Sequence, residues 1–174
     1  GATSQGEYAV GVGYNSGATN QGEYAVGVGF NAGNTSQGIQ ALAIGNYAGQ
    51  LYQNESATAI GNGAGNTSQG FGAVAIGIFA GKYNQQTAAV AIGDQSGYTG
   101  QQQFSVAIGF TAGNSNQGEN SVGIGLSAGS IAQSQNSVAI GSNSGKTSQG
   151  DSCVAIGPYA GYTGQQSSAV AIGP

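Results

Sequence analysis

The chain has 174 residues, of which 35 are Gly and only 5% are charged, and it contains no His, Met or Trp. Its formal net charge is −4, and Lys82 and Lys146 are its only basic residues. Two separated lysines cannot replace the counterions of a nucleic acid or hold a chain on an anionic membrane, so we expect neither partner. No long apolar run occurs, which predicts no membrane insertion by this segment. Cys153 is the only cysteine, which excludes an internal disulfide and a thiolate metal cluster.

A period of sixteen residues runs through the whole chain without an insertion when Gly1 is taken as position 1 of the repeat. Gly occupies position 13 of every unit, from Gly13 to Gly173. The eleven units begin at Gly1, Gly17, Gly33, Gly49, Gly65, Gly81, Gly97, Gly113, Gly129, Gly145 and Gly161. We therefore treat residues 1–174 as a single repeat domain. Because it begins without Met, we expect it to be a fragment of a longer fibrous protein.

Positions 8–13 of each unit predict a β-strand. Position 10 is Val in nine units, position 12 is Ile or Val in all, and positions 9 and 11 hold only small residues. Alternation of β-branched and small residues is typical of strands, and sixteen residues are too few for a strand plus a helix. The sequence therefore predicts an all-β protein, a parallel β-solenoid or β-roll of eleven coils in which each strand stacks on its copy in the next coil.

We expect the branched residues at positions 10 and 12 to fill the roll. The predicted core consists of Val10, Val12, Val74, Ile76, Val90, Ile92, Val106, Ile108, Val138, Ile140, Val154 and Ile156. The small residues at positions 9 and 11 would then face other copies of the chain. In the alternative, this small face packs against the second strand of its own coil.

Gln occupies position 5 in every unit and predicts a ladder of side-chain amides along the axis, with one rung every ~4.8 Å. The alternative is a plain polar turn. The column consists of Gln5, Gln21, Gln37, Gln53, Gln69, Gln85, Gln101, Gln117, Gln133, Gln149 and Gln165.

The segments NSVAIG at 136–141, NSVGIG at 120–125 and SVAIG at 105–109, each followed by a short turn with Gly and Ala, resemble the head repeats of YadA-like trimeric autotransporter adhesins. The resemblance implies a left-handed β-roll, a homotrimer, and attachment to a host or surface from a bacterial cell surface. The family's neck, coiled-coil stalk and membrane anchor are missing from this chain. The family's repeats are also shorter than the sixteen residues of the repeat in this chain. Similar repeats occur in phage and viral fibre proteins, so a virion surface stays open.

The sequence offers little for catalysis, and we predict no enzyme activity, no cofactor and no metal site. Without His, the many serines cannot be part of a Ser–His–Asp triad. Five of the six acidic residues share position 7, namely Glu7, Glu23, Glu55, Glu119 and Asp151. Stacked carboxylates could bind a hard cation, or they could form a solvated edge that discourages aggregation.

Aromatic residues at variable positions are candidates for a surface that contacts a protein or a glycan of unknown identity. These candidates are Tyr8, Tyr24, Phe30, Phe110 and Tyr159. They could equally cover the corners of their own coils. We also expect end-to-end stacking, because uncapped coils expose strand edges.

The predicted function is a structural or adhesive head or fibre segment, and an ice- or crystal-binding solenoid is the alternative from another class. That alternative depends on Thr at position 3 in seven units: Thr3, Thr19, Thr35, Thr67, Thr99, Thr147 and Thr163. The other four units carry Leu51, Tyr83, Ser115 and Ile131 there and interrupt the column.

Overall fold

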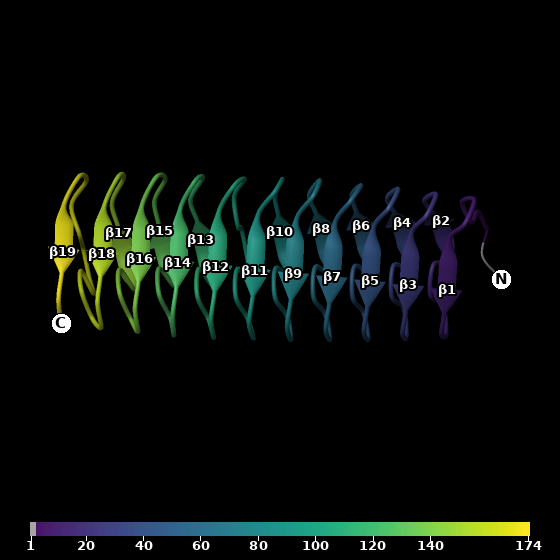
Figure 1. The fold of residues 1–174 in the computed structure, drawn as a ribbon, viewed down its shortest axis with the longest axis horizontal. Coiled ribbons are helices and arrows are strands. Elements are labelled where there is room, and N and C mark those ends of the chain that lie inside the picture. Colours follow the sequence, from purple (N-terminus) through teal and green to yellow (C-terminus); the bar gives the residue numbers. More distant parts are fainter. Residues whose placement is uncertain (1–2) are drawn as a thin grey trace.

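A computed structural model describes residues 3–174, which form a parallel β-solenoid with no helix in that range. The coils stack into a straight rod, and the two ends of the chain lie at opposite ends of it (Figure 1). Within each sheet, neighbouring strands are sixteen residues apart in the sequence and pair in parallel, as Val26 does with Leu42. The predicted all-β solenoid of sixteen-residue coils is confirmed.

The first sheet contains positions 10–12 of every unit and runs the length of the rod as eleven parallel strands. Equivalent positions pair in register, because each coil has the same length as the next. The strands are β1 (Val10–Val12), β3 (Val26–Val28), β5 (Leu42–Ile44), β7 (Thr58–Ile60), β9 (Val74–Ile76), β11 (Val90–Ile92), β12 (Val106–Ile108), β14 (Val122–Ile124), β16 (Val138–Ile140), β18 (Val154–Ile156) and β19 (Val170–Ile172).

The second sheet contains positions 3–5 and is divided into five strands and three strands. Its strands are β2 (Thr19–Gln21), β4 (Thr35–Gln37), β6 (Leu51–Gln53), β8 (Thr67–Gln69), β10 (Tyr83–Gln85), β13 (Ser115–Gln117), β15 (Ile131–Gln133) and β17 (Thr147–Gln149). Between β10 and β13, Thr99 makes only isolated bridges, and so does Thr163 beyond β17. Both threonines precede a Gly, Gly100 or Gly164, at position 4.

Two turns join the strands of each coil, a long one from position 13 to position 2 and a short one from position 6 to position 9. Gly is required at position 13 of the long turn. Gly45 has a φ of 129°, and a Cβ there would lie 2.6 Å from the carbonyl oxygen of Gly61 in the next coil. Any other residue would combine a strained backbone with a collision, which explains why this glycine never varies.

The interior is made of alanines and glutamines. Ala43, Ala48 and Ala57, at positions 11, 16 and 9, are fully buried, as are most of their equivalents. The Gln side chains at position 5 fill the remaining space between the two sheets and are 3% exposed or less from Gln21 to Gln149. This interior corrects the predicted core.

The branched residues point outward, so the prediction that they fill the roll is wrong. All twelve predicted core residues are half-buried or exposed: Val10, Val12, Val74, Ile76, Val90, Ile92, Val106, Ile108, Val138, Ile140, Val154 and Ile156. The alternation correctly predicts a strand with two unlike faces. The small side chains face the interior, however, and the branched side chains face outward. Because a coil with two three-residue strands is flat, only Ala and one extended amide side chain fit between its sheets.

Candidate interaction surfaces

The outward side of the first sheet is an almost continuous apolar stripe, here called the valine–isoleucine face and defined by positions 10 and 12 of its eleven strands. It carries no charged residue, and Thr58 is its only polar one. The exposed fraction is 36% to 39% at Ile44, Ile92, Ile140 and Ile156. Apolar stripes of this length on a protein surface mark sites of interaction. Sequence reasoning had placed these residues inside and therefore missed the surface.

The glutamine column forms an amide ladder inside the rod. Gln69 Nε2 donates to Gln85 Oε1 at 3.1 Å, and Gln85 Nε2 donates to Gln101 Oε1 at 3.1 Å. The same nitrogen of Gln85 lies 2.8 Å from the Val74 carbonyl oxygen, so each amide also ties the two sheets together. The ladder is interrupted where Gln53 Oε1 and Gln149 Oε1 have no partner. From Gln21 to Gln149 these side chains are buried and support the fold.

Position 9 accepts small polar residues because the short turn offers an acceptor. Ser121 Oγ donates to the Gly118 carbonyl oxygen at 2.6 Å, and Ser137 Oγ donates to the Ser134 carbonyl oxygen at the same distance. Cys153 occupies the equivalent place, and its Sγ lies 2.8 Å from the Gln166 carbonyl oxygen. Cys153 is buried, which fits a space-filling role.

The edge formed by the short turns carries five of the six acidic residues, and Asp94 lies in a long turn. Glu7 and Glu23 lie in adjacent coils, whereas the remaining acids of position 7 are separated by at least one coil. Among residues 3–174, no group of three or more His, Cys, Asp or Glu side chains could hold a metal ion. A hydrogen bond to Glu23 raises the pKa of the Tyr24 hydroxyl, and the negative charge of Glu23 adds to this rise.

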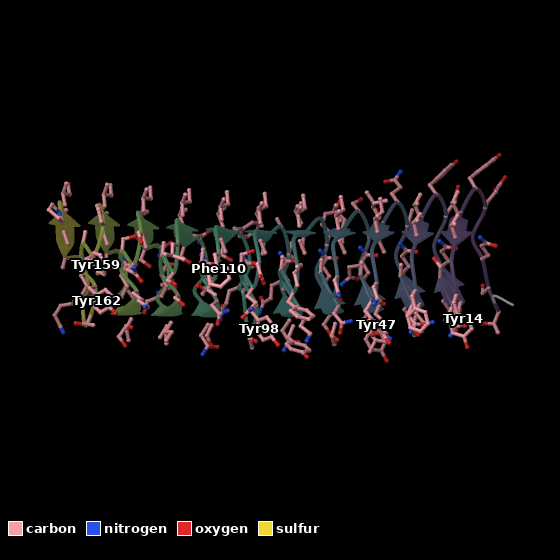
Figure 2. The ribbon with its side chains drawn as sticks, turned by 90° about the horizontal axis from the view of Figure 1, so that it is seen from below. Tyr14, Tyr47, Tyr98, Phe110, Tyr159 and Tyr162 are labelled. Carbon is pink, nitrogen blue, oxygen red and sulfur yellow. The ribbon has the colours of Figure 1, made fainter. Side chains whose placement is uncertain are left out.

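The predicted aromatic ligand residues do not form one surface. Tyr8 and Tyr24 stack at the short-turn edge, with ring centroids 5.2 Å apart. Phe30 lies at the long-turn edge. Phe110 and Tyr159 lie farther along the rod, 51% and 60% exposed (Figure 2).

Phe30 belongs to an aromatic row that the sequence analysis did not single out. Its ring stacks on that of Tyr14, with the ring centroids 5.3 Å apart, and meets the ring of Tyr47 edge-on at the same centroid distance. The three residues come from successive coils. Tyr14 and Tyr47 lie along one side of the rod (Figure 2). Stacking of this kind covers the long turns, so it supports the alternative that these rings protect the corners of their own coils.

A lysine lies among aromatic rings at the long-turn edge, and sequence reasoning missed this cluster as well. Lys82 Nζ is 4.3 Å from the centre of the Phe79 ring, 4.8 Å from that of Tyr83 and 5.4 Å from that of Tyr98. Hydrogen bonding to Tyr83 raises the pKa of Lys82, although partial burial works against this rise. The cation is thus engaged within the chain by cation–π contacts.

A polar groove crosses β6, β8 and β10 on the second sheet. It has a volume of about 490 Å³ and is lined by Tyr52, Asn54, Ser68, Gly70, Asn84, Gln85, Gln86 and Thr87. None of the predicted site residues except Gln85 belongs to it. The signal in the sequence was the replacement of the usual small residues at positions 4 and 6 by Tyr52, Asn54 and Gln86.

No part of residues 3–174 forms an apolar helix long enough to cross a bilayer. No protein-family model matches the chain, and no curated protein or solved structure is significantly similar to it. The likeness to YadA-like head repeats therefore rests on the residues of the repeat alone, and what is established is a β-solenoid of sixteen-residue coils.

Proposed function

We propose that this chain is a structural and adhesive segment of a trimeric head or fibre, similar to YadA-like head repeats and displayed on the outside of a cell or virion. The observation that carries the proposal is the valine–isoleucine face. The rod closes its own interior with Ala and Gln, so this face is not needed to complete the coil. Its branched side chains are therefore available to another molecule.

The occupant that fits this face best is a second copy of the chain. Another copy presents the same branched residues at the same spacing, one rung per coil, so the two faces can match along the whole rod. The face carries no charge, so no ionised group would lose its water on association. Closed symmetry around an axis would bury every copy's face and leave none for open-ended growth.

The resemblance supports three copies, and the corrected geometry changes which residues would meet at the axis. The sequence analysis assigned the small residues of positions 9 and 11 to the contact. These side chains are buried within their own coils, so the proposed contact passes to positions 10 and 12. An absence of catalysis and a location outside the cell are part of the same proposal, supported by the repeat and the low charge.

Light scattering across a dilution series tests the assembly. We expect a mass near three times the 16.9 kDa of one chain. Replacing Ile92 and Ile108 by Lys would place charges in the contact and should reduce the mass to that of one chain, because a buried unpaired ammonium is costly.

The matched control is Ile131→Lys, since Ile131 is also an exposed strand residue but belongs to β15 of the second sheet. This variant should keep the mass of the assembly. A single-chain mass for the unmodified protein would contradict the proposal, and so would equal effects of the changes on the two faces.

The ice- or crystal-binding alternative receives less support. The threonines of position 3 are paired in register, as Thr19 and Thr35 are, but Leu51 and Tyr83 interrupt the column. The hydroxyls of Thr35 and Thr67 donate to the preceding asparagines, so they are already engaged within the chain. Thermal hysteresis in a concentrated sample would revive this alternative.

A further inference from the structure

The polar groove on the second sheet is a departure from the regular repeat. The coil of residues 49–64 carries Tyr52 at position 4 and Asn54 at position 6, and the coil of residues 81–96 carries Asn84 and Gln86 at the same positions. The coil between them has Ser68 and Gly70 there. Large side chains on two coils and small ones on the coil between them open the hollow of about 490 Å³.

The groove offers hydrogen-bonding groups that the fold does not use. Some amide side chains of residues 3–174 bond within the chain: Asn66 Nδ2 donates to the Tyr47 carbonyl oxygen at 3.0 Å, and the buried glutamines bond to one another. Asn54, Asn84 and Gln86 are exposed, and their amides make no such bond. An amide presents both donors and an acceptor, which suits hydroxyl groups that do the same.

An aromatic wall accompanies these amides. Tyr52 is 59% exposed and is the only aromatic residue at position 4 in the chain. Its backbone is held at a φ of 57°, in line with the other residues of position 4, so the ring is placed by the repeat. One aromatic face beside convergent uncharged polar groups suits a ligand with an apolar C–H face and a rim of hydroxyls.

From this geometry we infer that the groove binds a neutral carbohydrate, with one sugar ring against Tyr52 and its hydroxyls at the amides of Asn54, Asn84 and Gln86. Two rungs separate Tyr52 from Asn84, which is roughly 10 Å and leaves room for a sugar ring. The exposed Glu55 follows Asn54 at the rim and disfavours an acidic sugar.

The inference rests on the adhesive part of the proposed function and names its ligand class. It does not depend on the trimer, because the groove and the valine–isoleucine face lie on different sheets. Carbohydrate binding and self-association can therefore fail separately.

The test is binding of the full chain to an array of immobilised neutral oligosaccharides, with sialylated versions beside them. We expect binding to one or more neutral sugars, weakened at least tenfold by Tyr52→Ser and by Asn84→Ser. Ser occurs at position 4 in other coils with the same positive φ, so both variants should fold. Ser68→Tyr, which fills the hollow, should weaken binding as well.

The matched controls are Tyr14→Ser and Asn116→Ser. Tyr14 is 68% exposed at position 14, where another unit carries Ser142, and Asn116 occupies position 4 outside the groove. Both controls should bind as the unmodified chain does. Light scattering on Tyr52→Ser should give an unchanged mass, which separates this result from a loss of assembly. Binding of no neutral sugar, binding of sialylated sugars alone, or equal losses in Tyr14→Ser and Tyr52→Ser would overturn the inference.

Discussion

Gln85 illustrates how a single side chain joins neighbouring coils. Its Nε2 is 2.8 Å from the Val74 carbonyl oxygen in the first sheet and donates to Gln101 Oε1 in the next coil. Its Oε1 accepts from Gln69. The invariant Gly81 makes room for this amide, since a Cβ there would lie 2.7 Å from Gln85 Oε1. The Gln at position 5 of the repeat therefore requires a Gly at position 1.

We predict that Gln85→Glu destabilises the rod by about 3 kcal/mol or more, because it replaces a buried donor by an acceptor facing carbonyl oxygens. The free energy of unfolding from a denaturant titration measures this loss. Burial raises the pKa of the new carboxyl, and a group whose folded pKa is raised is favoured in its protonated form. The variant should therefore recover part of its stability as the pH falls through that folded pKa toward the lower pKa of the unfolded chain.

Gln103→Glu is the control for this change, because Gln103 is only half-buried and other units carry Glu at the same position 7. Its stability should differ from that of the unmodified chain by less than about 0.5 kcal/mol. Equal stability of the two variants would show that the ladder contributes little.

At the scale of the strand, the sequence predicted the strands of the first sheet but exchanged their faces. The alternation at positions 9–12 predicts strands, and the eleven strands of the first sheet lie there. Alternation by itself does not tell which side is covered, and the preference of Val and Ile for interiors indicated the wrong side. The deciding fact is the narrow space between the two sheets, which follows from the turns of the whole coil and not from any strand.

The candidate site was harder to foresee for a related reason. The groove combines residues of three coils, at positions 4 and 6, which look like ordinary turn variation along the sequence. The aromatic residues that stood out in the sequence, such as Tyr8 and Phe30, lie on different edges of the rod. Only the stacking of coils indicates which variable positions meet.

We predict that Ala75→Leu destabilises the rod by about 2–3 kcal/mol, because Ala75 is fully buried between the sheets and the added atoms must displace packed neighbours. Thermal or denaturant unfolding measures the effect. Ser115→Leu adds an equally large side chain to an outward strand position where another unit carries Leu51, and it should change stability by less than about 1 kcal/mol. If Ala75→Leu and Ser115→Leu reduce the free energy of unfolding by the same amount, the assignment of the inward and outward faces is wrong.

At the scale of the whole molecule, the rod has two unlike sides. The first sheet runs unbroken along the rod and carries the valine–isoleucine face, and the second carries polar residues, the groove and a break at Thr99. A continuous apolar side is suited to contact along its full length, whereas the varied side is suited to local recognition. The account therefore assigns assembly to the first sheet and ligand contact to the second.

The most direct test of this assignment is the reactivity of an introduced cysteine toward a maleimide. The buried Cys153 is first replaced by Ser, which other units carry at the same position 9. In that background, Ile92→Cys should be protected in the assembly and become reactive when dilution separates the chains. Ile131→Cys, on the second sheet, should react rapidly at every concentration. Equal reactivity of the two cysteines in a sample of multi-chain mass would contradict the account.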